Sequence, residues 1–224
     1  MKLIQTQPSL TQQVYDVIAD EICDGALPAG AHLVQEQLAE RLGVSRQPVQ
    51  QAMALLKADG MVEEIGRRGL QVTPLDLDFV RHHYDIRAAL DGLAARMAAT
   101  RCRDGKAFGR KLAERGGEVL RLGETAVRNG AVGDQVRHDA AFHDLIYRAS
   151  GNPLLARAAE PHWRFLRRAM GDVLRHAELP REIWRQHAEI LDAIVAGEPS
   201  RAEELAIDHD LRAAKTLKAA LSEK

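Results

Sequence analysis

The chain has 224 residues, enough for one large or two ordinary domains, and its formal net charge is −1 at pH 7. Aromatic residues make up only 4% and alanine is plentiful, a composition that favours a mostly helical protein. Two cysteines exclude a disulfide framework, and the absence of a long apolar run excludes a membrane-spanning segment. The first ten residues do not resemble a signal peptide, so we expect a cytoplasmic protein.

The first predicted element is an amphipathic helix over residues 8–23. Its apolar residues recur at helical spacing and mark the predicted buried face: Val14, Val17, Ile18 and Ile22. A loop containing glycine and proline follows over residues 24–30. We expect residues 31–34 to form a short strand that pairs with a hairpin further along the chain.

Residues 35–72 have the pattern of a helix, a tight turn, a second helix and a small hairpin. Gly43 can end the first helix because a glycine adopts positive φ without strain, and Ser45 is a good N-cap for the second. The second helix ends at Gly60, and its predicted inner face comprises Val49, Ala52, Met53, Leu55 and Leu56. Two helices joined by a turn of about three to four residues can place the second helix in the DNA major groove.

The predicted hairpin has a basic tip, Gly66-Arg67-Arg68-Gly69. Glycines at both ends of this tip suit a tight turn. Beside a recognition helix, a basic tip is typical of a wing that contacts phosphate or the minor groove. The helical pattern alone would also fit a helical hairpin with a solvated turn, and the position of the wing favours the DNA-binding interpretation.

The charge of this region opposes the simplest form of that interpretation. Residues 1–78 contain 6 Lys or Arg and 11 Asp or Glu, a net charge of −5. A DNA-binding region is normally basic. We therefore expect non-specific DNA affinity to be weak and strongly dependent on salt, and binding to depend on a few well-placed residues.

The second half of the chain is predicted to be entirely helical. Residues 74–78 form the best linker, which divides the chain into domains 1–75 and 76–224. Glycine and proline breaks separate the predicted helices, which cover residues 77–102, 105–129, 133–150, 154–177, 181–197 and 200–222. They predict an antiparallel bundle of six helices, or of seven, with Gly116-Gly117 as a kink in the second. Such a bundle can enclose a ligand cavity.

Four residues of this bundle could bind a metal. Asp139 and His143 lie four apart, so a helix presents both on one face, and His187 and His209 lie on two later amphipathic helices. Three imidazoles and a carboxylate suit a divalent transition metal such as zinc, nickel or manganese. The alternative is that these histidines only pack in the core or lie at the surface, because nine histidines occur in the chain.

The chain resembles the GntR-type transcriptional regulators. Residues 14–30 and 38–62 and the basic hairpin tip are similar to their winged-helix domain. Residues 84–99, 139–155 and 187–213 resemble, in order and spacing, the all-helical FCD domain of the FadR branch. The resemblance implies a homodimer that binds double-stranded DNA at a palindromic operator and responds to a small metabolite.

The same resemblance implies a ligand set for the second domain. In many such domains an Asp-x3-His pair and two later histidines hold a metal, which carries over to Asp139, His143, His187 and His209. Organic acids are common effectors in this branch, and their carboxylate can complete the metal shell. An arginine on the first helix of the domain can also hold the acid, which implies Arg87 in this chain.

One residue of the predicted recognition helix departs from the family. Gln50 stands where the family usually has arginine. Arginine favours guanine, whereas glutamine can pair with adenine N6 and N7, so we predict an unusual operator. The residues predicted to contact bases or phosphates are Ser45, Arg46, Gln47, Gln50 and Gln51, together with Arg67 and Arg68 of the wing.

The sequence thus predicts a mainly α protein, with an N-terminal winged helix and a C-terminal helical bundle. Its predicted function is that of a metabolite-responsive DNA-binding regulator, not an enzyme. One alternative is a metal-dependent hydrolase of the HD type, because His138 and Asp139 form the HD dipeptide. A second alternative is a metal-free regulator that senses an acyl ligand.

Overall fold

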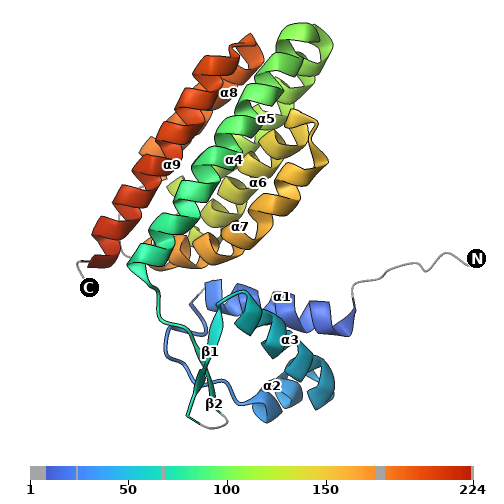
Figure 1. Cartoon of the computed structure of the whole chain (residues 1–224), viewed down its shortest axis with the longest axis vertical. Coiled ribbons are helices and arrows are strands. Elements are labelled where there is room, and N and C mark those ends of the chain that lie inside the picture. Colours follow the sequence, from blue (N-terminus) through green and yellow to red (C-terminus); the bar gives the residue numbers. More distant parts are fainter. Residues whose placement is uncertain (1–8, 24, 67–68, 175–179, 223–224) are drawn as a thin grey trace, which may run out of the picture. The chain divides into compact units, whose positions relative to one another are not determined.

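The computed structural model describes residues 9–23, 25–66, 69–174 and 180–222. The chain divides into two compact units, Met1–Leu75 and Asp76–Lys224. Figure 1 shows the small unit with the hairpin and the larger helical unit. No helix of the described residues is long and apolar enough to cross a membrane.

The small unit contains three helices, α1 Leu10–Cys23, α2 Gln35–Leu42 and α3 Arg46–Ala58. Helix α1 begins after Ser9, whose hydroxyl accepts a hydrogen bond of 3.1 Å from the backbone N–H of Gln12. This bond satisfies one of the free N–H groups of the first turn. The predicted start at residue 8 lies outside the described residues.

The turn between α2 and α3 follows the prediction at Gly43 and departs from it at Ser45. Gly43 is left-handed, with φ of 66°, and Val44 N–H returns to the carbonyl of Ala39 at 3.0 Å. Ser45 occupies the N-cap position of α3, but its side chain makes no capping hydrogen bond, so the predicted cap is wrong in that respect. The Ser45 side chain is exposed instead.

The helices of the small unit enclose one apolar core, with Ile18, Val49 and Leu56 fully buried. Two predicted core residues are wrong: Val17 is 42% exposed and Leu55 is 44% exposed. The buried stripe of α1 runs through Tyr15 and Ala19, which places Val17 on the outer side of the helix. Leu55 lies at the margin of the stripe of α3, which is formed by Pro48, Val49, Ala52, Met53 and Leu56.

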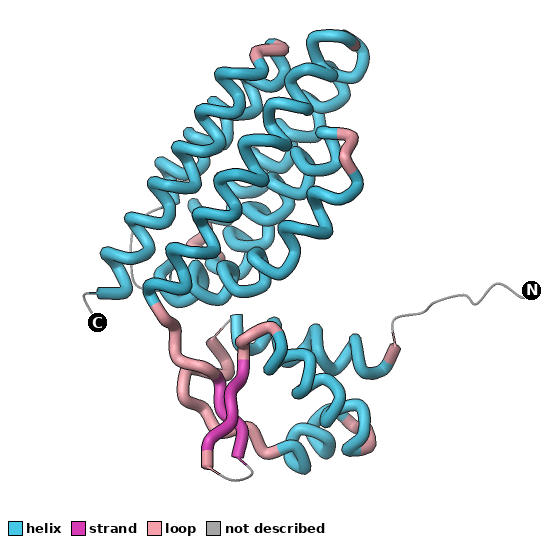
Figure 2. The backbone as a smooth tube through the Cα atoms, viewed as in Figure 1, coloured by secondary structure: helices cyan, strands magenta, loops and turns pink. Residues whose placement is uncertain are grey.

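The hairpin pairs β1 Val62–Ile65 with β2 Gly69–Val72 in antiparallel register, with Val62 opposite Val72. The predicted strand at 31–34 is reduced to a single bridge between His32 and Gln71. The wing therefore forms as expected, whereas its tip residues Arg67 and Arg68 lie outside the described residues. Figure 2 shows the two strands beside the three helices of this unit.

The larger unit has six helices in its described residues, as the sequence predicts. They are α4 Leu77–Asp104, α5 Lys106–Arg128, α6 Val132–Ser150, α7 Pro153–Leu174, α8 Pro180–Ala196 and α9 Pro199–Ser222. The Asp76 carboxylate caps α4, accepting hydrogen bonds from the backbone N–H groups of Asp78 and Phe79. Helix α4 contacts each of the other five helices, so its inner face lies at the centre of the bundle.

Helix α5 runs without interruption through Gly116-Gly117, so the glycine pair does not divide the helix. Two glycines of α5 instead allow α8 to approach closely. A Cβ atom on Gly116 would lie 2.5 Å from Leu191, and one on Gly123 would lie 2.0 Å from the Trp184 ring. Gly117 has no such neighbour within 4 Å. The glycines at 116 and 123 thus have a packing role.

Candidate functional sites

Three helices bring four predicted metal ligands together in the bundle. Helix α6 carries Asp139 and His143 one turn apart, while α8 carries His187 and α9 carries His209. Each residue offers one ligand atom, and these atoms all lie within 4.8 Å of one another. All four side chains are buried, and His187 is fully inaccessible.

The donor spacing fits a first-row transition metal. The Nε2 atom of His187 lies 3.2 Å from Nε2 of His209 and 3.4 Å from Oδ1 of Asp139. Neighbouring ligands at about 2.0–2.1 Å from one ion are about 3.3–3.4 Å from each other in a tetrahedral arrangement and about 2.8–3.0 Å in an octahedral one. Imidazole and carboxylate donors suit zinc, nickel and manganese alike, so these residues fit such an ion without selecting one.

Burial also shifts the pKa values of the candidate ligands. It lowers the pKa of His187 and His209 well below the ordinary value, and neighbouring His143 lowers both further, so both rings are neutral near pH 7. Burial raises the pKa of Asp139, an effect that His143 and Arg87 partly oppose. Neutral rings keep a lone pair for a metal, and a dication would favour the ionised form of Asp139.

A buried hydrogen-bonded chain supports His143. The indole N–H of Trp163 donates to the Tyr147 hydroxyl at 3.2 Å, and this hydroxyl donates to Oδ1 of Asp91. The other oxygen of Asp91 lies 3.0 Å from Nδ1 of His143. Burial opposes ionisation of Asp91. The neighbouring Arg87 and His143 together have the larger effect, and they hold the pKa of Asp91 well below its ordinary value. Asp91 can therefore fix the orientation of the His143 ring.

Arg87, the predicted effector ligand, lies beside the four residues and is fully buried. Its Nη2 atom contacts Asp91 at 2.8 Å and Asp210 at 3.1 Å, and its guanidinium lies 3.8 Å above the Trp163 ring. The pKa of Asp210 is raised well above the ordinary value because burial outweighs the effect of Arg87.

Sequence reasoning missed both carboxylates. The i,i+4 spacing of Arg87 and Asp91 was available as a signal, as was the position of Asp210 next to His209. Spacing alone, however, does not show that α4 and α9 meet.

His138, the first residue of the HD dipeptide, is not part of the cluster. It is half-buried, while Asp139 beside it faces the other ligands. A second pair of histidines, His83 and His162, has its Nδ1 atoms 2.9 Å apart. The four-residue group is the one set of candidate ligands found among the described residues, and it contains the aspartate but not the histidine of the dipeptide that the hydrolase alternative requires.

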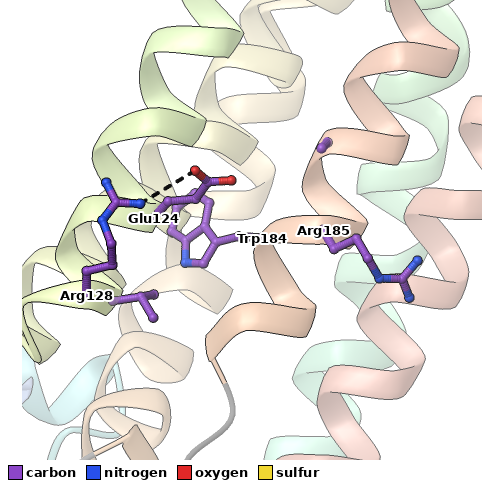
Figure 3. A pocket seen from close by; sticks show the side chains of 6 residues that line it. Glu124, Arg128, Trp184 and Arg185 are labelled. Carbon is purple, nitrogen blue, oxygen red and sulfur yellow. Dashed lines mark ion pairs between the residues drawn. The ribbon is translucent and has the colours of Figure 1, made fainter.

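A surface hollow of about 450 Å³ lies between α5 and α8. Glu124 and Arg128 line it from α5, and Trp184 and Arg185 line it from α8 (Figure 3). The Trp184 ring also packs edge-on against His187, with centroids 5.1 Å apart. One side chain thus lines the hollow and contacts a candidate metal ligand.

In the small unit, the predicted DNA contacts of α3 share one exposed surface. This surface comprises Ser45, Arg46, Gln47, Gln50 and Gln51, whereas Pro48 and Val49 between them are buried. The Arg46 guanidinium pairs with Glu36 of α2, and Gln51 accepts a hydrogen bond of 2.6 Å from Thr11. These exposed side chains lie outside the core, as the DNA-contacting side chains of a recognition helix must.

A winged helix with an exposed second helix, joined to a helical unit with a buried donor cluster, defines a ligand-sensing DNA-binding protein. Comparison with known families agrees: residues 10–72 match the bacterial regulatory proteins of the gntR family, and residues 82–212 match the FCD domain. The chain belongs to the GntR family of transcriptional regulators and carries an FCD domain. It is a metabolite-responsive DNA-binding regulator. Members of this family are regulatory proteins.

Two relatives are similar to this chain over most of their length. A probable D-xylose utilization operon transcriptional repressor of Paenarthrobacter nicotinovorans is 31% identical and covers 91% of this chain and 87% of the relative. The transcriptional repressor RspR of Escherichia coli K12 is 25% identical over 86% of this chain and 82% of its own. The structure of E. coli McbR/YncC has the same fold, with a TM-score of 0.78 and 23% sequence identity. The match covers 94% of this chain and 98% of McbR/YncC.

Proposed function

We propose that this regulator senses a small organic acid at a transition metal bound by Asp139, His143, His187 and His209. The observation that carries the proposal is the convergence of four buried donors within 4.8 Å from three helices. A bound ion would supply a Lewis-acidic centre with open coordination positions for a carboxylate.

The surrounding residues support an acidic effector. Arg87 is a buried cation beside the cluster, with Nη2 at 3.2 Å from both ring nitrogens of His143. A guanidinium binds carboxylates through two parallel hydrogen bonds. Trp163 and Tyr84 lie against its faces and restrict its orientation. A carboxylate at this place would meet both a positive side chain and the metal position.

The output of the proposed mechanism is operator binding by a homodimer. Acid binding would shift the populations of two arrangements that differ in the spacing of the winged domains, and half-site fit depends on that spacing. A coupling of about 1–3 kcal/mol changes operator affinity by about 5–150-fold. We propose that α3 contacts DNA through Ser45, Arg46, Gln47, Gln50 and Gln51, and the wing through Arg67 and Arg68.

Operator binding in the presence of organic acids tests the proposal. We expect at least one acid from a panel of hydroxy, keto and dicarboxylic acids to change the operator affinity of the metal-loaded protein. The same acid should have no effect on His187→Ala, because the metal position is lost. An acid response that His187→Ala retains in full would contradict the role of the metal.

A further inference from the structure

Two buried carboxylates share the guanidinium of Arg87, but they are held unequally. Asp91 also contacts the Tyr147 hydroxyl and the His143 ring. Asp210 contacts Arg87 at 3.1 Å, and neither of its oxygens accepts a hydrogen bond from the described residues. The side chain of Asp210 is nevertheless fully buried. A buried carboxyl group with so few partners is weakly held, because burial and the neighbouring Asp91 oppose its ionisation beside Arg87.

Arg87 has unused binding capacity on the same side chain. Its Nε–H is buried and has no partner among the described residues. A free carboxylate that reached Nε and an Nη atom together would form the two parallel bonds that a guanidinium prefers. Asp210 makes no such bidentate contact, because its one ion pair is with Nη2. An external carboxylate can therefore bind Arg87 better than Asp210 does.

We propose that Asp210 occupies the effector's place on Arg87, and that the effector's carboxylate displaces it. This inference rests on the proposed function and names the internal group with which the acid competes. Asp210 directly follows His209 on α9, while Arg87 lies on α4. Exchange of the two carboxylates would break a contact between α4 and α9 beside a candidate metal ligand. The displacement is thus a route from acid binding to movement of α9.

Rescue with a small carboxylate tests the exchange directly. Asp210→Ala removes a carboxylate from the Arg87 site, and formate has the size of the group removed. We expect formate to raise the melting temperature of this variant more than that of the wild type, with chloride at equal ionic strength as reference. The matched control is Asp208→Ala, because Asp208 lies on the same helix but is 51% exposed and pairs with Arg212. An equal response of all three proteins would overturn the proposal.

A second variant keeps the test decisive if Asp210→Ala does not fold. Asp210→Asn preserves the shape of the side chain and removes its carboxyl group. We expect the full-length variant to bind acetate about tenfold more tightly than the wild type in calorimetry. Equal or weaker binding would overturn the proposal. Neither measurement needs added metal, so both test the displacement of Asp210 even if the protein binds no metal. Failure of the displacement can therefore be distinguished from failure of the proposed metal site.

Discussion

Asp91 is the residue on which the geometry of His143 depends. Its Oδ2 atom lies 3.0 Å from Nδ1 of His143, so it can keep that nitrogen protonated and leave Nε2 for a metal. We predict that Asp91→Asn lowers zinc affinity by about 10–100-fold, measured by competition with a chelator. The control is Asp85→Asn, which removes an exposed carboxylate from the same helix. Equal zinc affinity in both variants would show that Asp91 does not position His143.

The ligands of the candidate metal site predict an unusual pH dependence. Asp139, whose pKa is raised in the metal-free protein, must lose its proton for metal to bind. Zinc affinity should therefore fall as the pH falls through that raised pKa. The pKa values of His187 and His209 lie well below 6.5, so both rings are already neutral at pH 6.5 and cause no loss of zinc affinity near that pH. Calorimetric titration with zinc at several pH values measures the dependence. A fall in zinc affinity near pH 6.5 with the uptake of two protons would contradict this prediction.

Glu36 is the residue that limits Arg46 in the small unit. The two side chains form an exposed ion pair at the start of α3. We predict that Glu36→Gln strengthens DNA binding by about two- to fivefold, because Arg46 becomes free to contact phosphate or a base. Fluorescence anisotropy at several salt concentrations measures this effect. Glu40→Gln removes the same charge from the same helix, and an equal gain in that control would show that the ion pair itself is unimportant.

At the scale of the elements, the contact between α5 and α8 depends on Gly123. A Cβ there would meet the Trp184 ring, which packs against His187. We predict that Gly123→Ala destabilises the protein by about 1–3 kcal/mol in chemical denaturation. Gly117→Ala should be neutral or stabilising by about 0.5–1 kcal/mol, since nothing lies within 4 Å of its Cβ position. Similar losses of stability in both variants would mean that the loss arises from helix geometry and not from contact with the Trp184 ring.

The helices themselves could be predicted from the sequence because their breaks carry local signals. Gly43 ends α2 in a left-handed conformation, and Gly151 ends α6 in the same way. The errors arose where burial depends on neighbours in space. Val17 and Leu55 are apolar at plausible helical positions, yet the stripes that face the core lie elsewhere. Periodicity over a short helix does not resolve the centre of its buried face.

The candidate site was predictable only in part for a similar reason. The i,i+4 pair of Asp139 and His143 is a local pattern, whereas His187 and His209 join it only through the packing of three helices. The partners of Arg87 depend on the contact of α4 with α9, which no sequence spacing reveals. The role of Asp210 could therefore not be predicted from its sequence position, although it contacts the predicted effector arginine.

In the whole molecule, acid and operator must change each other's affinity equally if the two sites are coupled. If an acid weakens operator affinity tenfold, operator DNA must weaken acid affinity by the same factor. Calorimetric titration of the acid into the free protein and into the operator complex checks this reciprocity. Equality of the two factors is required by linkage whatever the mechanism, so it checks that both titrations reach equilibrium. An acid that binds the free protein and the operator complex with the same affinity would contradict the proposed coupling.

The proposed sensing mechanism depends on a transition metal held by four buried residues of the bundle. Elemental mass spectrometry of the protein, purified without chelator, measures this metal. We expect about one transition-metal ion per chain in the wild type and little or none in His143→Ala and His187→Ala. Wild-type protein without metal that also fails to take up zinc, nickel or manganese would contradict it.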